Sequence, residues 1–440
     1  MEDTFSLIKD TLRYSVNTWN PRFLDKLYAG TNPIGVIAEL VLAVLNNNGH
    51  VYHCSPVVSL MEVQVTRATA RLLGMGEQAS GLFCPGGSAS NLLAMVTARN
   101  RLFPTIKTEG YFPRPMHPNA TYGTLTVFTS THSHYSIAKS AQVLGLGLKH
   151  VIKVPTDKEG RMDVDQLEQR MQASVDRGET PFFINATSGT TVMGAFDPLD
   201  RMAKVARQFG CWLHADGSWG GSAIFSEQVQ KTNCFKGSQL VDSFTMNPHK
   251  LLGVPLQCSM LLAKEGHGLF AEANSLQADY LFHGNEYDLG AGTIGCGRRP
   301  DALKVFLAWK FYGQQGLGKR VDRAIATTKA LTDHLRQRPG FHLVQEPPFV
   351  QVCFWYLPEH LDWQRWRRDG SYDSKVSQVT RSLHEKVNQS GRFLVDRAPL
   401  VDQPDFFRLV INAPTVRLDR DLIPLLDLIE TTAKDMTWSL

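Results

Sequence analysis

The chain has little of what marks several classes of protein. Its seven cysteines among 440 residues are odd in number and form no Cys-x-x-Cys pair, which argues against a disulfide scaffold and a structural zinc site. The 46 Lys and Arg residues nearly balance 42 Asp and Glu residues, and no basic cluster indicates a nucleic-acid surface. No apolar run approaches the roughly 20 residues of a membrane span, and residues 1–13 lack the apolar core of a signal peptide. We therefore expect a cytoplasmic protein with no metal, no nucleic-acid partner and no membrane partner.

What the chain does have is enough apolar sequence for a large core, at 43% of its residues. Through its middle, short apolar runs alternate with segments of helical periodicity. Strands are predicted at 125–128, 150–154, 182–184, 211–215 and 259–263, and helices at 34–45, 136–144, 164–177 and 199–209. Such alternation predicts βαβ units, and hence an α/β fold with a mostly parallel sheet covered by helices.

The pattern of predicted helices and strands changes near Pro300. The elements predicted after it are helices at 301–312 and 320–336, strands at 349–356 and 407–411, and a last helix from Asp419. This pattern indicates a smaller α+β domain at the C-terminal end. We therefore expect three parts, namely an N-terminal segment 1–55, a large domain 56–312 and a small domain 313–440.

A glycine-rich turn and two polar loops indicate where a ligand could bind. Gly86 and Gly87 open a predicted helix whose N-terminal N–H groups suit a phosphate group, although a plain turn with an N-cap is the simpler interpretation. His134 follows a strand and could stack on a planar cofactor or serve only as a structural group. The hydroxyls of 187–191 follow another strand, at the end where open α/β sheets bind ligands; a solvated polar loop has the same composition.

Asp216 and Lys250 add to this series. Asp216 ends an apolar strand, where a buried carboxylate needs a partner. Lys250 lies in an apolar stretch that would favour the neutral, nucleophilic form of its amine. Either residue alone could belong to an ordinary ion pair. In order along the chain, however, the features match what pyridoxal phosphate needs: a helix N-terminus for its phosphate, a carboxylate for its pyridine nitrogen and a Lys for the Schiff base.

At these residues the chain resembles a known family, the group II pyridoxal-phosphate-dependent decarboxylases, on the branch of glutamate, cysteine-sulfinate and aspartate decarboxylases. The similar segments are 83–88, 133–136, 186–192, 194–198, 247–252, 256–259, 296–299 and 406–408. The Asn-Pro-His-Lys block that ends at Lys250 is the most specific of them. The resemblance implies a fold-type I enzyme with a seven-stranded type of sheet. It also implies a homodimer whose active sites take residues from both subunits, with the N-terminal segment 1–55 contributing to the dimer and to the substrate pocket.

The resemblance further implies roles for individual residues. The expected catalytic residues are Lys250, Asp216, His134 and Tyr287. The expected cofactor-binding residues are Ser88, Ala89, His134, Thr187, Asp216, Asn247, His249 and Lys250. The expected substrate-binding residues are Arg408, Lys26, Tyr28 and His50. Among these, Tyr287 would return a proton to the product from a mobile loop, and Arg408 would bind a substrate carboxylate through the bidentate geometry that Arg favours.

Departures from the family bear on the reaction and on the substrate. Ser218 stands where the family has an Ala beneath the cofactor ring, and the loop after Tyr287 is short and glycine-rich. His50 replaces an aromatic residue. Lys26 and Tyr28 stand where glutamate decarboxylases carry Gln and Ser, which favours a short acidic substrate, aspartate or cysteine sulfinate, over glutamate. If Lys26 instead faces solvent, an aromatic or neutral substrate fits.

The sequence therefore predicts an enzyme that decarboxylates a small acidic L-amino acid to the amine and carbon dioxide. Other interpretations stay open. The same cofactor could serve decarboxylation coupled to oxidative deamination, or a non-decarboxylating lyase. The chain could also be a catalytically silent binding subunit, against which the retained Lys250 and Asp216 argue. A serine hydrolase is disfavoured because the chain has no Gly-x-Ser-x-Gly elbow.

Overall fold

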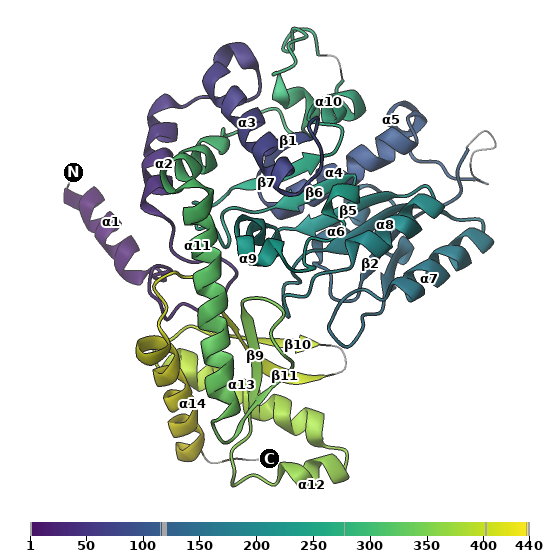
Figure 1. Cartoon of the computed structure of the whole chain (residues 1–440). Helices are drawn as coiled ribbons and strands as arrows, with labels where there is room; N and C mark the ends of the chain where they lie inside the picture. The colour runs from purple at the N-terminus through teal and green to yellow at the C-terminus, as the bar shows by residue number, and fades with distance from the viewer. Residues whose placement is uncertain are drawn as a thin grey trace. The chain divides into compact units, whose positions relative to one another are not determined.

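The computed structural model describes residues 2–114, 116, 121–276, 278–400, 403–436 and 438, which form two compact units (Figure 1). The larger unit comprises Thr31–Thr328 and Gln345–Gln351, and the smaller one comprises Met1–Gly30, Lys329–Val344 and Val352–Leu440. This division differs from the expected boundaries after residues 55 and 312. The first 30 residues group with the smaller unit, and the long helix α11 (Ala302–Arg336) continues past residue 312 before the chain changes unit.

A seven-stranded sheet forms the centre of the larger unit. Its strands, in spatial order, are β1 (Ser80–Cys84), β7 (Ser259–Ala263), β6 (Ser243–Met246), β5 (Trp212–Gly217), β4 (Thr180–Thr187), β2 (Leu125–Ser130) and β3 (Val151–Val154). β7 runs antiparallel to both of its neighbours, while the contiguous pairs from β6 to β3 are parallel. The predicted α/β fold with a mostly parallel sheet is thus confirmed.

Helices account for most of the remaining larger unit. They are α2 (Pro33–Leu45), α3 (Pro56–Leu72), α4 (Gly87–Leu102), α5 (Thr105–Glu109), α6 (Ser136–Val143), α7 (Val164–Asp176), α8 (Leu199–Gln208), α9 (Glu227–Gln230), α10 (Gly268–Asn274) and the first part of α11. Local sequence fixes several of their ends: Asn32 caps α2 by accepting a hydrogen bond from Gly35 N at 2.7 Å. Within the described residues, no helix is both long and apolar enough to cross a membrane.

The strands of the parallel region are buried along their whole length, which is why they appear in the sequence as continuous apolar runs. Every residue of β2 and β5 is buried, as is all of β4 except Thr180. Sheets covered on both faces require such strands, because no face is left to water. Polar residues inside these strands, such as His214 and Asp216, must therefore find partners within the protein.

The smaller unit is built on a four-stranded sheet. Its strands, in spatial order, are β10 (Asp396–Leu400), β11 (Gln403–Val410), β9 (Gln351–Tyr356) and β8 (Phe341–Leu343), and its helices are α1 (Glu2–Tyr14), α12 (Trp363–Arg368), α13 (Tyr372–Gln389), α14 (Ile423–Asp435) and the end of α11. This confirms a smaller α+β body towards the C-terminus. The two helices predicted at 301–312 and 320–336 are confirmed: α11 consists of two helices that meet at a kink, where Gly313 leaves helical geometry (φ 67°, ψ 171°).

Candidate active site

The carboxyl ends of neighbouring parallel strands bring several predicted residues together in the larger unit. Thr187 ends β4 and pairs in register with Asp216 near the end of β5. β6 is the next strand, and Asn247, His249 and Lys250 follow its last residue. Because parallel strands end at the same edge of a sheet, these side chains occupy the edge where open α/β sheets bind ligands.

Asp216 is a buried carboxylate that the structure keeps ionised. It is 4% exposed, and its Oδ atoms accept hydrogen bonds from Ser218 N at 3.0 Å and from Asn91 Nδ2 at 2.8 Å. Burial acts to raise the pKa of Asp216. The hydrogen bonds from Ser218 and Asn91 act to lower it, and the pKa lies below its usual value. The sheet edge therefore holds a fixed negative charge.

His134 follows β2 and lies within electrostatic reach of both predicted charges. Burial lowers its pKa; the carboxylate of Asp216 acts to raise it, and the amine of Lys250 acts to lower it. Its Nδ1 accepts a hydrogen bond from Ser136 N at 3.3 Å, which leaves the proton of the neutral ring on Nε2. A half-buried neutral imidazole beside a carboxylate and an amine suits stacking on a planar ring.

The turn before α4 packs so closely on Ser218 and Asn247 that it requires glycine. Gly86 has φ 96°, a conformation that favours glycine. A Cβ on Gly87 would lie 2.5 Å from Ser218 Oγ and 2.7 Å from Asn247 Nδ2, so only glycine fits there without displacing them. Ser88 and Ala89 follow at the N-terminus of α4, the end of a helix whose dipole favours an anion, and Ala89 N donates to Gly86 O at 3.1 Å. A cavity of about 270 Å³ lies beside this turn, lined in part by Ala89 and Gln257.

Thr187 carries a buried hydroxyl that has no hydrogen-bond partner among the described residues, although the side chain is only 4% exposed. Its backbone N donates to Asp197 Oδ2 at 2.7 Å, and Asp197 Oδ1 accepts from Met162 N at 2.6 Å. Burial raises the pKa of Asp197 to about 7, against the two backbone hydrogen bonds. A buried hydroxyl without a partner in the described part of the chain, on the residue that pairs in register with Asp216, indicates that a polar group of a ligand binds beside Thr187.

His249 and its backbone partners hold the segment that carries Lys250. His249 Nδ1 hydrogen-bonds the backbone of Cys258, and burial lowers the pKa of His249 to about 4. The same segment is fixed by Lys304, which sequence reasoning missed. Its fully buried Nζ donates to the carbonyls of Pro255 and Gln257 at 3.1 and 2.7 Å, and pairs with Glu39 and Asp301.

The structure places Tyr287 against the segment that contains His50. The Tyr287 ring lies 5.6 Å from the ring of Tyr52 and 6.3 Å from that of His267, between centroids. Gly290 N donates to His50 O at 2.9 Å, so the loop that follows Tyr287 is tied to the N-terminal segment. A hydrogen bond to Glu286 raises the pKa of Tyr287, which keeps its phenol protonated.

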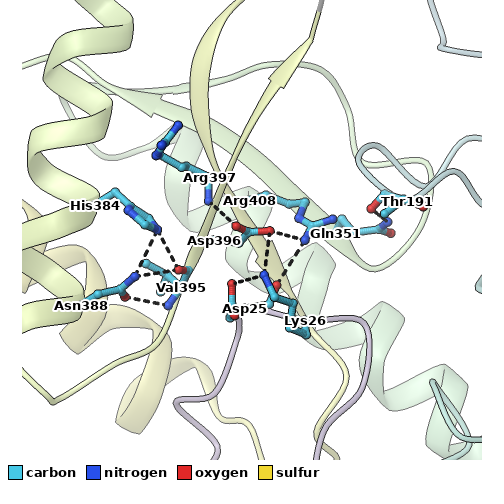
Figure 2. Close-up of polar contacts among 10 residues, drawn as sticks. All are labelled: Asp25, Lys26, Thr191, Gln351, His384, Asn388, Val395, Asp396, Arg397 and Arg408. Carbon is cyan, nitrogen blue, oxygen red and sulfur yellow. Dashed lines mark hydrogen bonds and ion pairs between the residues drawn. The ribbon is translucent and has the colours of Figure 1, made fainter. Parts of the chain in front are cut away.

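In the smaller unit, Lys26 and Arg408 converge on one carboxylate (Figure 2). Arg408 Nη2 pairs with Asp396 and donates to the carbonyl of Asp25 at 3.2 Å. Lys26 Nζ lies 3.1 Å from Asp25 Oδ1 and 3.9 Å from Asp396 Oδ2. Tyr28 packs on the core of this unit, with its ring 5.7 Å from that of Phe23. Sequence reasoning did not identify Asp396, which has no motif of its own.

Comparison with known proteins adds to this geometry. Residues 1–357 match the family described as the pyridoxal-dependent decarboxylase conserved domain. An L-aspartate decarboxylase of Metarhizium robertsii is 42% identical over 417 residues, or 93% of this chain and 79% of the relative. The cysteine sulfinic acid decarboxylase of Mus musculus is 38% identical over 99% of this chain and 86% of its own. A crystal structure of mouse CSAD in apo form has a TM-score of 0.91 at 37% identity, covering 99% of this chain and 89% of that one.

Proposed function

The chain belongs to the family of pyridoxal-dependent decarboxylases, and on that premise we propose that it converts aspartate or cysteine sulfinate, in preference to glutamate, to the amine and carbon dioxide. The resemblance inferred from the motifs is confirmed, and the chain is an amino-acid decarboxylase that uses pyridoxal phosphate. The observation that carries the proposal is the buried carboxylate of Asp216 in electrostatic reach of the His134 imidazole, which is itself in reach of the Lys250 amine. The roles of single residues given below are part of the proposal.

The residues present fit pyridoxal phosphate. The cradle at Gly87 and the N-terminus of α4 suit a phosphate group, and the buried hydroxyl of Thr187 lacks a partner among the described residues. The residues that would hold the cofactor are Ser88, Ala89, Asn247 and His249 at the phosphate, His134 and Thr187 at the ring, Asp216 at the ring nitrogen and Lys250 by a covalent bond. When bound, the cofactor supplies an electron sink for the bond that breaks.

We propose that Asp216, His134 and Tyr287 each support one step of the reaction. Asp216 would hold a proton on the nitrogen of the cofactor ring, because a fixed carboxylate favours the protonated base. His134 would cover one face of the ring and exclude water from it. Tyr287 keeps its phenolic proton, as its raised pKa requires, and is the proposed donor of the proton that the product needs.

The substrate class follows from cations in the smaller unit and from the relatives. Arg408 is the proposed site for a substrate carboxylate, because its guanidinium already binds one carboxylate, that of Asp396. Lys26 supplies a second positive charge close to the same carboxylate, while Tyr28 adds bulk. His50 remains a proposed substrate contact. The curated relatives that are named for aspartate, cysteine sulfinate and acidic amino acids support the same class.

The proposal includes a homodimer. α2 presents a band of exposed apolar side chains, among them Ile37 at 52%, Leu40 at 63% and Val44 at 86% exposed, beside its buried residues Ala38 and Leu42. A second copy of the chain would cover such a face, since exposed contiguous apolar surface marks an interface. The cytoplasmic location expected from the sequence stays a prediction.

The experiment that tests the function measures products. Purified protein is incubated separately with aspartate, cysteine sulfinate, glutamate and an aromatic amino acid; released carbon dioxide, amine, aldehyde and ammonia are quantified. We expect the amine of aspartate or cysteine sulfinate, with a smaller preference for acids in Lys26→Gln. Lys250→Ala, which should show no turnover, is the control. Faster turnover of the aromatic substrate would refute the substrate class, and aldehyde with ammonia as main products would indicate the altered outcome that Ser218 motivated.

A further inference from the structure

A line of buried polar side chains runs from β5 and β6 to α4 and ends at Asp216. Trp212 Nε1 lies 2.8 Å from Ser243 Oγ, which lies 2.8 Å from His214 Nδ1. His214 Nε2 lies 3.1 Å from Asn91 Oδ1, and Asn91 Nδ2 lies 2.8 Å from Asp216 Oδ2. Each of the five residues is at most 6% exposed, so water cannot stand in for any of these partners.

The direction of the hydrogen bonds in this line follows from its Asp216 end and from a neutral His214 ring. An indole N–H only donates, so Trp212 donates to Ser243 Oγ, whose hydroxyl can still donate to His214 Nδ1. At the other end, an ionised carboxylate only accepts, so Asn91 must present its amide nitrogen to Asp216. The Asn91 oxygen then faces His214 Nε2, which has to donate.

Two further contacts agree with this direction. The second N–H of Asn91 donates to Ser136 Oγ at 3.0 Å, so both of its protons and its oxygen are used. Thr245 Oγ1 lies 3.4 Å from His214 Nε2 and offers only a longer, second contact. Burial lowers the pKa of His214 to about 4, although the charge of Asp216 and a hydrogen bond to the Ser243 backbone act to raise it, so the imidazole is neutral and has one proton.

We propose that His214 and Asn91 are positioning residues that hold the carboxylate of Asp216 in one orientation and in its ionised state, through a hydrogen-bond relay that runs in one direction from Trp212. This inference rests on the proposed role of Asp216 and extends it to residues that touch neither cofactor nor substrate. The titratable groups in electrostatic reach of Asp216 are His214 on β5 and His134 after β2. Asn91 contributes a donor without a charge, from α4.

The tautomer of His214 tests the relay in the apoprotein. Protein labelled with ¹⁵N at histidine is followed by long-range ¹H–¹⁵N NMR between about pH 5 and 8, the range in which an ordinary imidazole titrates. We expect one ring that stays neutral with its proton on Nε2 and that is missing from the spectrum of His214→Gln. A His214 ring that is protonated on Nδ1, or that titrates in this range, would overturn the relay.

Paired variants test its effect on the holoenzyme. Asn91→Ala removes the donor to Asp216, whereas Ser136→Ala removes the other partner of Asn91 and leaves Asp216 untouched. For Asn91→Ala we expect a kcat lower by about ten- to a hundredfold, the range for a hydrogen bond to a charged group, with a weaker cofactor dissociation constant and little change in the KM of the amino acid. Ser136→Ala should leave the cofactor dissociation constant near the wild-type value. Equal effects of the two variants would show a merely structural role.

His214 gives a conservative comparison. Gln in its place can still donate to Asn91 and accept from Ser243, whereas Leu can do neither. We expect His214→Gln to retain more cofactor affinity than His214→Leu, and the reverse order would contradict the relay. If the wild-type protein bound no pyridoxal phosphate, the proposed function would fail, while the NMR result would still decide the relay.

Discussion

A buried ion pair between Glu62 and Arg298 supports the turn at which the cofactor phosphate is proposed to bind. Their side chains are 2% and 7% exposed. Glu62 Oε1 accepts a hydrogen bond from Phe83 N at 2.8 Å, and Arg298 Nη2 donates to Phe83 O at 3.1 Å. Arg298 Nη1 also donates to Gly49 O at 2.7 Å. The pair therefore holds both backbone polar groups of Phe83, near the end of the strand that leads into the turn.

Glu62→Gln keeps the shape of the side chain and removes its charge. Because Arg298 would remain buried without a carboxylate, we expect a loss of about 3–5 kcal/mol in the free energy of unfolding, as for other buried pairs that lose one partner. Arg71 and Glu77 provide the matched control, since Arg71 lies in the same helix and pairs with Glu77 at 2.8 Å in exposed surroundings. Glu77→Gln should cost about 0–1 kcal/mol.

The assay is equilibrium unfolding of the apoprotein in urea, at one protein concentration, for wild type and both variants. Reconstitution with pyridoxal phosphate then gives the cofactor dissociation constant, which we expect to rise in Glu62→Gln because a neutral amide holds Arg298, the donor to Phe83 O, less firmly. A Glu62→Gln variant no less stable than Glu77→Gln would refute the reasoning. An unchanged dissociation constant would show that the ion pair stabilises the fold without shaping the turn.

Three other expectations follow from single side chains. Burial lowers the pKa of His249 from 6.5 to about 4, so between these values the unfolded chain binds a proton at His249 and the folded chain does not. The free energy of unfolding therefore falls as pH falls from about 6.5 towards 4. His249→Gln should make it depend less on pH over this range, as measured by urea unfolding. Gly87→Ala should weaken cofactor binding in a reconstitution titration because its Cβ would meet Ser218 Oγ, and adding Ser218→Ala should recover part of the affinity. Tyr287→Phe should raise the ratio of aldehyde to amine, measured by mass spectrometry; clean amine at the wild-type rate would show that another group donates the proton.

Much of the fold could be predicted because buried parallel strands have a strong apolar signal. The strands predicted in this way at 125–128 and 182–184 lie within β2 and β4, which are longer by two and five residues. β1 and β6 were not predicted, because each is five residues or fewer and contains Ser or Gly, which weakens that signal. The antiparallel direction of β7 was not predicted either, since a fully buried strand has the same pattern in both directions.

Site residues at strand ends could be predicted from the sequence, whereas those placed by packing between elements could not. Thr187 and Asp216 come together because the ends of parallel strands share an edge, which the order of elements alone indicates. The contribution of His214 and Asn91 depends on the packing of α4 against β5, and no motif encodes that packing. A polar residue within an apolar run was visible in the sequence at His214, but its partner was not.

The motif that contains Arg408 indicates a carboxylate-binding side chain, but it does not reveal that Asp396 already binds it. Asp396 on β10 lies directly opposite Arg408 on β11, in a register that the sequence does not reveal, and opposite charges at such positions attract. If the proposed substrate carboxylate binds at Arg408, it must replace or share the carboxylate of Asp396. Arg408 would then bind the substrate only by the difference between two carboxylates on one guanidinium. We therefore propose that Lys26 and Tyr28, at which this chain departs from the glutamate decarboxylases, select the substrate by its chain length.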